Sequence, residues 1–381
     1  MTYMIRRAYI FLIATALLSS CSPNEEPPIP GYEGPIVVEG EPRLSANAEV
    51  VDVTGDGLND VILAIGRHWP GPNLLFTGDG QGGFTAVDTL SFPQDRSYSV
   101  SAVDLDNDGD IDLVVSNDRP DPKYVLLNDG SGDFSNRVEF GDPMWPTRNI
   151  TVSDLNADGL PDIVVANRSD APEGDNWICL NTSSAEFSVA CAPLSSGSAT
   201  TIAVADVNGD GFPDLIIPYR DLGQSYVYVG DGTGAFEKGP SFGPADASFR
   251  ATEAVDLNHD GLLDLVAIDD RKPYTMAFYQ TDAFQFDEGH QLDAGDVVPY
   301  ALYVADLDLN GAKDVIVGYR DAPSILYFNR ADRLVQVAIG DSLGATYGFG
   351  VGDVNHDGVP DIVVARSAAS DVLFLGKIDH E

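Results

Sequence analysis

Hydrophobic and polar positions along the chain repeat as one unit of about 50 residues. In each unit a short, partly alternating segment such as 99–103 precedes an acidic loop, and a continuous apolar run such as 113–115 follows it. Alternation predicts a strand with one buried face, whereas unbroken apolar runs suit strands that are buried on both faces. A third apolar segment ends in a Gly-rich turn, as at 126–130, and a fourth begins near an aromatic residue such as Phe134. Each unit therefore predicts four antiparallel strands, which we call A to D.

The loop between strands A and B carries the pattern D-x-[D/N/T]-x-[D/N]-G-x-x-D, where x is any residue. Seven copies occur, at intervals of 52, 50, 52, 50, 50 and 47 residues, and they begin at Asp52, Asp104, Asp154, Asp206, Asp256, Asp306 and Asp353. Four-stranded units of this length, repeated radially, form a β-propeller. The sequence therefore predicts an all-β fold, a seven-bladed propeller of four-stranded antiparallel blades over residues 35–377. An open β-solenoid is the less favoured alternative because its rungs are shorter.

The ends of the chain predict how the ring closes. The last unit supplies three strands, near 348–353, 361–364 and 372–375, while a strand-like segment at 35–39 precedes the first unit. If this N-terminal strand pairs as the fourth strand of the last blade, the sheet has no free edge.

Residues 1–20 have the pattern of an export signal. Arg6 and Arg7 precede an apolar stretch over 8–18. That stretch is shorter than the roughly 20 residues that a transmembrane helix needs.

The segment 18–21 (LSSC) resembles the lipobox of bacterial lipoproteins. This resemblance implies cleavage before Cys21 and lipidation of that cysteine, so that the protein is held at a membrane of the bacterial cell envelope. Ser22 favours the outer membrane; an ordinary signal peptide with an incidental cysteine is the alternative. Residues 21–34 are rich in Pro, Glu and Gly and predict a flexible tether, and 378–381 form a tail.

The clearest copy of the repeat, 349–361, reads FGVGDVNHDGVPD. It resembles the FG-GAP/VCBS repeats of bacterial surface proteins, which are similar to the propeller blades of integrin α subunits. The resemblance covers residues 35–377 and implies a propeller with calcium bound in its loops. It implies no single function, because such repeats occur in adhesins, lectins and polysaccharide-degrading enzymes.

The chemistry of the acidic loops supports calcium independently of the resemblance. Ca²⁺ takes six to eight oxygen ligands, and side chains at loop positions 1, 3, 5 and 9 supply them around a sharp turn at the glycine in position 6. Here the closing residue is Asp at position 9 and strands flank the loop, unlike an EF-hand. We expect up to seven structural ions, bound most tightly by the second loop, with four carboxylates, and most weakly by the first, with Thr54. The predicted ligands are Asp52, Thr54, Asp56, Asp60, Asp104, Asp106, Asp108, Asp112, Asp154, Asn156, Asp158, Asp162, Asp206, Asn208, Asp210, Asp214, Asp256, Asn258, Asp260, Asp264, Asp306, Asp308, Asn310, Asp314, Asp353, Asn355, Asp357 and Asp361.

The loops at the opposite face carry arginines. Each B–C loop has one, 13 to 15 residues after the first Asp of its unit: Arg67, Arg119, Arg168, Arg220, Arg271, Arg320 and Arg366. The D–A loops add Arg96, Tyr98, Arg148, Arg250, Tyr300 and Tyr347 to the same face. Guanidinium groups bind carboxylate and sulfate in a bidentate manner, so these residues predict a site for an acidic glycan, or for a protein ligand, at the mouth of the central channel.

A structural interpretation competes with this one, because each arginine could instead tie its loop to a neighbouring acid, such as Asp118, Asp170, Asp221, Asp270 or Asp321. Residues that break the symmetry are therefore the more informative ligand candidates: His68, Trp69, Trp145, Arg148 and Arg250.

Charge and motifs narrow the function. The chain has 21 Lys+Arg against 60 Asp+Glu, a net charge of −39, which excludes nucleic acid as a partner. No GxSxG, HExxH, P-loop or dinucleotide motif occurs. We expect a non-catalytic binding or adhesion module. The alternatives are a lyase acting on acidic polysaccharide, with His68 or Tyr98 as its base, and a scaffold subunit of a cell-envelope complex.

Cys179 and Cys191 fall on the predicted third and fourth strands of one blade. Across such a hairpin they can form a disulfide in an oxidising compartment or remain as free thiols.

Overall fold

The computed structural model describes residues 26–90, 95–168, 175–182, 189–221, 223–281, 283–293 and 296–378. The predicted signal at 1–20, the lipidation site Cys21 and the tail residues 379–381 lie outside these ranges. Within them the regular structure is entirely β, and none of it is a helix long and apolar enough to cross a membrane.

Five antiparallel sheets have four strands each, in the order A to D that the sequence predicts. The first three are β5 (Ser97–Val103), β6 (Asp112–Asn117), β7 (Lys123–Leu127) and β8 (Asn136–Phe140); β9 (Thr147–Ser153), β10 (Asp162–Asn167), β11 (Asp175–Asn181) and β12 (Val189–Ser196); and β13 (Ala203–Ala205), β14 (Asp214–Ile217), β15 (Ser225–Gly230) and β16 (Phe236–Phe242). The others are β17 (Phe249–Val255), β18 (Asp264–Asp269), β19 (Tyr274–Phe278) and β22 (His290–Gln291), with β20 (Gln280–Thr281) and β21 (Gln285–Phe286) as a separate pair; and β23 (Pro299–Ala305), β24 (Asp314–Tyr319), β25 (Ser324–Arg330) and β26 (Arg333–Ile339).

A six-stranded sheet joins the two ends of the chain. Its strands, in spatial order, are β27 (Ala345–Gly352), β28 (Asp361–Lys377), β1 (Gly31–Val51), β2 (Asp60–Ile65), β3 (Leu74–Gly78) and β4 (Phe84–Thr89). The first half of β1 pairs antiparallel with the end of β28, with Val37 opposite Val372, and its second half pairs with β2. The N-terminal strand therefore pairs with the last strand of the chain.

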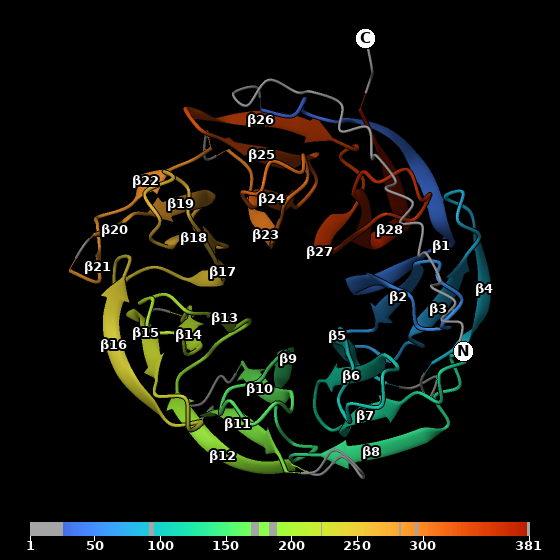
Figure 1. The fold of residues 1–381 in the computed structure, drawn as a ribbon, viewed down its shortest axis with the longest axis horizontal. Helices are drawn as coiled ribbons and strands as arrows, with labels where there is room; N and C mark the ends of the chain where they lie inside the picture. Colours follow the sequence, from blue (N-terminus) through green and yellow to red (C-terminus); the bar gives the residue numbers. More distant parts are fainter. Residues whose placement is uncertain are drawn as a thin grey trace, which may run out of the picture.

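The sheets surround a central axis, with each A strand innermost and each D strand at the rim (Figure 1). This arrangement confirms a β-propeller with four-stranded antiparallel blades. Sheets of four or more strands number six in the described ranges, so the pairing pattern does not confirm the predicted count of seven blades.

The hydrophobic core lies between neighbouring sheets. One cluster joins Ile62 and Ala64 of β2 to Leu113 and Val115 of β6, with Tyr124 of β7 beside them. The B strands β2, β6, β10, β18 and β24 are buried along their whole length. Sheets on both sides cover these strands, which explains their unbroken apolar runs.

The N-terminal boundary differs from the predicted one. The sequence predicts a flexible tether up to residue 34, but β1 begins at Gly31, and Ile29 and Tyr32 pack against the cluster between the last two units. Glu26 also accepts a hydrogen bond from Nε of Arg330 at 2.7 Å. The Pro-rich composition of this segment is equally compatible with an extended chain that lies along a sheet edge.

Cys179 and Cys191 are directly paired across β11 and β12, with their Cα atoms 3.9 Å apart, and they form a disulfide.

Candidate functional site

The acidic A–B loops share one backbone design. Asp112, at position 9 of the second loop, accepts the N–H of Leu105 at 2.9 Å with one carboxylate oxygen and the N–H of Asn128 at 2.8 Å with the other. The Asp at position 9 makes the same two kinds of bond in all seven copies. Position 9 therefore ties the loop to strand C. Burial raises the pKa of this group, to about 6 for Asp112 and about 7 for Asp314.

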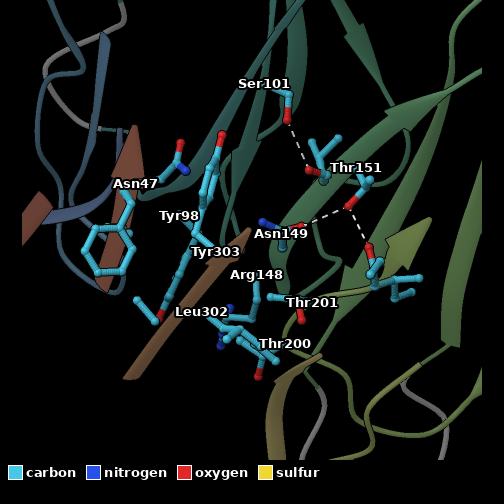
Figure 2. A pocket seen from close by; sticks show the side chains of 18 of the residues that line it. Asn47, Tyr98, Ser101, Arg148, Asn149, Thr151, Thr200, Thr201, Leu302 and Tyr303 are labelled. Carbon is cyan, nitrogen blue, oxygen red and sulfur yellow. Dashed lines mark hydrogen bonds between the residues drawn. The ribbon is translucent and has the colours of Figure 1, made fainter. Parts of the chain in front are cut away.

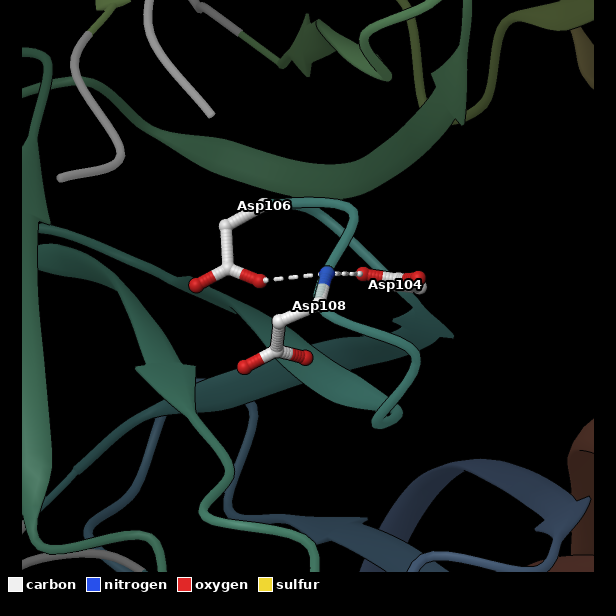
Figure 3. A group of neighbouring side chains, drawn as sticks. All are labelled: Asp104, Asp106 and Asp108. Carbon is white, nitrogen blue, oxygen red and sulfur yellow. Dashed lines mark hydrogen bonds between the residues drawn. The ribbon is translucent and has the colours of Figure 1, made fainter. Parts of the chain in front are cut away.

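Carboxylates converge most clearly in the second loop (Figure 3). Oxygens of Asp104, Asp106 and Asp108 lie within 4.8 Å of one another, and the backbone N–H of Asp108 donates to both of the other carboxylates. Gly109, at position 6, adopts a φ of 98°. A cluster of hard oxygen ligands around a turn fits Ca²⁺, as the spacing predicts.

In four other loops position 3 is an asparagine. Its Nδ2 donates to the carboxylate at position 5, for example from Asn156 to Asp158 at 2.9 Å. These amides would have to turn their oxygen inward to ligate an ion. The remaining cluster, Asp306, Asp308 and Asp314, belongs to the sixth loop.

The A strands surround a cavity of about 470 Å³ in the central channel, which extends to the end of these strands opposite the acidic loops, the channel mouth (Figure 2). Its wall is held by hydrogen bonds between neighbouring A strands: the hydroxyl of Ser101 donates to Ile150 O at 3.1 Å, and that of Thr151 to Ile202 O at 2.7 Å. A volume of this size lies in the range of small-molecule binding pockets.

A ring of large side chains lines the mouth. Its members each stand six residues before the first Asp of their unit, and they are Tyr98, Arg148, Thr200, Arg250, Tyr300 and Tyr347. The sequence predicts five of them in D–A loops, whereas the structure places these five in the first strands β5, β9, β17, β23 and β27. Their common offset from the acidic loop is the signal that would have identified the ring, Thr200 included.

Arg250 and Arg148 project into this ring in different ways. Arg250 donates from Nε to Tyr300 O at 2.6 Å, and its guanidinium lies 4.7 Å from the ring centre of Tyr300 and 5.1 Å from that of Tyr347. Burial lowers its pKa. Arg148 forms an ion pair with Asp118 at 2.6 Å, and its buried Nε has no hydrogen-bond partner among the described residues.

Five of the predicted B–C arginines are paired with acids. Arg220 contacts Asp270, Arg168 and Arg271 both contact Asp221 at 3.6 and 2.5 Å, Arg320 contacts Asp321 at 3.5 Å, and Arg366 contacts Asp341 at 2.8 Å. These contacts match the structural interpretation, in which each B–C arginine ties its loop to an acid. Asp170 lies outside the described residues.

The other two B–C arginines differ: Arg119 is exposed, and Arg67 stacks its guanidinium 4.1 Å from the ring centre of Tyr347.

His68 and Tyr98, two separate candidates in the sequence, meet at the mouth. The Tyr98 hydroxyl lies 2.8 Å from His68 Nε2, and His68 Nδ1 lies 3.0 Å from Asp118. Because a carboxylate only accepts, we assign the ring proton to Nδ1, so that Nε2 accepts from the tyrosine. Burial lowers the pKa of His68, which favours the neutral imidazole. Trp69 beside it is 56% exposed.

Deeper in the channel are two acids that the sequence analysis missed. Glu49 and Glu253 each stand three residues before the first Asp of their unit and line the cavity. Burial raises the pKa of Glu49 to about 8 and that of Glu253 to about 7. Their place in the repeat was visible in the sequence, but their position inside the channel was not.

The repeats match a known family model, the FG-GAP-like repeat, in overlapping segments at 52–115, 104–165, 154–217, 206–267, 256–317 and 306–364. The chain belongs to the FG-GAP-like repeat family. Each of the six segments ends in the B strand of the next unit, and the last one covers the seventh acidic loop. No curated protein matches this FG-GAP-like chain.

Solved structures support the fold of this FG-GAP-like protein. Two are BBS1N in complex with ARL6DN, soaked with mercury or with lead; each aligns with a TM-score of 0.62 at 12% and 14% identity, covering 91% of this chain and 96% of the other. A third is an Agrocybe aegerita lectin described as recognising non-reducing terminal N-acetylglucosamine, with a TM-score of 0.54, 16% identity, and coverage of 87% and 86%. At these identities the similarity shows the fold alone.

Proposed function

We propose that this protein is a calcium-stabilised, extracytoplasmic binding or adhesion module that takes acidic glycans at the mouth of its channel. The observation that carries this proposal is the ring of Arg148, Arg250, Tyr98, Tyr300 and Tyr347 around the cavity of about 470 Å³. Basic side chains are few in this chain, yet two of them, Arg148 and Arg250, belong to this ring.

The contacts of Arg250 favour an anionic ligand. Among the described residues its contacts are a carbonyl oxygen and the faces of Tyr300 and Tyr347, and no carboxylate pairs with it. Its terminal nitrogens can therefore donate to a carboxylate or sulfate in a bidentate manner. Arg148 lines the same cavity and brings a second guanidinium to it, with Nη1 paired to Asp118. Tyrosine rings offer flat, amphipathic surfaces for a sugar ring.

Seven blades are part of the proposal. Gly376 N donates to Asp361 Oδ1 at 2.8 Å, so the two ends of β28 meet and this strand folds back on itself. The two halves of β1 pair with different strands, and the register shifts between Arg43 and Leu44 and again between Ser45 and Asn47. We therefore interpret the six-stranded sheet as two blades, which agrees with seven acidic loops and seven hydrophobic clusters.

Calcium and location complete the picture. The acidic loops concentrate carboxylates at the face opposite the channel mouth, and bound Ca²⁺ would relieve their repulsion. The LSSC segment at 18–21 supports a lipid anchor in the bacterial envelope, with Ser22 favouring the outer membrane.

The direct test is a glycan array probed with the protein lacking residues 1–21, in the presence of calcium. We expect binding to uronate-containing or sulfated glycans, and about ten-fold weaker binding, or none, for Arg250→Ala and Arg148→Ala. Arg320→Ala is the matched control, because Arg320 is exposed and pairs with the neighbouring Asp321. Equal binding by all three variants contradicts the proposed site. If no glycan on the array binds, the result would instead favour a protein ligand, as expected of a scaffold subunit.

A lyase is a second candidate, and the Tyr98–His68–Asp118 chain of hydrogen bonds favours it. In such an elimination Tyr98 removes the proton α to the uronate carboxyl group while passing its own proton to His68 Nε2. The electrons of the C–H bond form the new double bond, and the bond from the β-carbon to the bridging oxygen breaks. His68 returns its proton through Tyr98 to the leaving oxygen, and Arg148 or Arg250 neutralises the carboxylate.

Ultraviolet absorbance of the unsaturated product distinguishes the two candidates. A lyase predicts absorbance that grows with time for each glycan that binds, and its loss in Tyr98→Phe with binding retained. Binding without any absorbance change rejects the lyase and leaves the binding module.

A further inference from the structure

The sixth unit carries an arginine at a position where three of the other six units carry an aspartate and only the seventh carries another cation. In every unit one backbone N–H of strand C donates to the Asp at loop position 9. The residue that follows this donor is Arg330 in the sixth unit. In the other units, taken in order, that residue is Asp79, Asp129, Thr182, Asp231, Thr281 and Lys377.

Arg330 reaches into the acidic loop of its own unit. Its Nη1 donates to Asp308, the ligand predicted at position 3, and this carboxylate is fully buried. The Arg330 side chain is itself only 9% exposed. A buried carboxylate needs a countercharge, and here the guanidinium supplies it.

The sixth loop also departs from the others at position 5. Six loops have Asp there, whereas the sixth has Asn310. The Nδ2 of Asn310 donates to Asn329 O at 3.0 Å, so this side chain braces strand C. With an amide at position 5 and a guanidinium on Asp308, this loop does not fit Ca²⁺ as the second loop does.

The same guanidinium also holds the N-terminal segment. Nε of Arg330 donates to Glu26 at 2.7 Å, and Nη2 donates to Pro27 O at 2.6 Å. The other carboxylate oxygen of Glu26 accepts the backbone N–H of Ala331 at 2.7 Å. Residues 26 and 27 are therefore fixed on the acidic-loop face, next to the sixth loop.

We infer that Arg330 is the resident cation of the sixth loop in place of calcium, and that it fastens the N-terminal segment to the acidic-loop face. Glu26 and Pro27 lie at this face, so a lipid on nearby Cys21 would hold the acidic loops toward the membrane and leave the channel mouth facing away from it. The inference rests on the calcium-binding and lipid-anchor parts of the proposed function.

Crystals of the protein soaked with a lanthanide test the inference, because anomalous scattering shows which loops hold an ion. We expect peaks in other loops, the second above all, and none in the sixth. Arg330→Gln should add a peak in the sixth loop, whereas Glu26→Gln, which weakens only the docking of the N-terminal segment, should not.

An ion in the sixth loop of the unaltered protein overturns this inference and leaves the proposed function intact. Ions in no loop at all overturn both. Calorimetric titration with Ca²⁺ gives a second readout: Arg330→Gln should bind one more ion than the unaltered protein, and an unchanged stoichiometry would contradict the exchange of cations.

Discussion

Carboxylates with raised pKa values in this propeller differ in what faces them. The Asp at position 9 of each loop accepts two backbone N–H groups, which compensate part of its burial. Glu49 and Glu253 line the channel, and no ion pair of either is found in the described part of the chain. Burial accordingly raises the pKa of Glu49 to about 8 and of Glu253 to about 7. Both groups hold their protons well above the pH at which a free glutamate ionises.

This difference predicts a pH dependence of stability. Between about pH 4.5 and pH 8 the folded chain binds more protons than the unfolded chain at these two positions, so the free energy of unfolding falls as the pH rises. Melting temperatures should drop between pH 6 and pH 9. The drop should be smaller, by about 2 °C or more, in the Glu49→Gln, Glu253→Gln double variant. A variant with the same pH profile as the unaltered protein would show that the channel solvates both carboxylates.

At the level of strands, closure of the ring depends on β1. Val38 packs against the cluster beside β28, and Tyr32 against the cluster of the last two units. Deleting residues 31–39 should therefore lower the free energy of unfolding by about 3 kcal/mol or more, since two partly buried side chains lose their contacts and β28 loses its paired strand. Urea denaturation measures this. Deleting residues 21–25 is the control, and equal stability of the two truncated proteins would refute closure by β1.

Much of the fold was predictable from the sequence because the same pattern of polar and apolar positions recurs at nearly constant spacing. The A–B loop motif marks each unit, and the apolar runs mark the buried B strands. The site was only partly predictable: Arg148, Arg250 and Tyr347 were named, but placed in loops, and Glu49 and Glu253 were missed. Strand boundaries depend on pairing with neighbouring strands, and the meeting of Tyr98 with His68 depends on how two units pack. Neither follows from spacing along one chain.

Across the whole molecule, charge is the dominant feature. A net charge of −39 disfavours the compact state through self-repulsion, and the acidic loops gather much of that charge on one face. The channel mouth, at the other end of the A strands, instead presents arginines and tyrosines. We interpret this polarity as a division between a face that holds cations and a face that binds anions.

Removal of calcium should therefore destabilise the whole protein. An ion at 100 times its dissociation constant contributes about 2.7 kcal/mol per site, so a chelator that empties several loops should lower the melting temperature by about 10 °C or more. Added NaCl should restore part of this loss because it screens the repulsion between loops. A melting temperature that is the same with calcium and with chelator would contradict a structural role for the ion.

An anion-binding channel mouth is tested by calorimetric titration of the calcium-loaded protein with an acidic oligosaccharide and with the same oligosaccharide after reduction of its carboxyl groups. The probe is an acidic glycan that binds on the array. We expect the acidic form to bind at least about ten-fold more tightly than the reduced form, and we expect Arg250→Ala to abolish this difference while Arg320→Ala preserves it. Equal affinity for both forms, or a difference that survives Arg250→Ala, would contradict an anion-binding channel mouth.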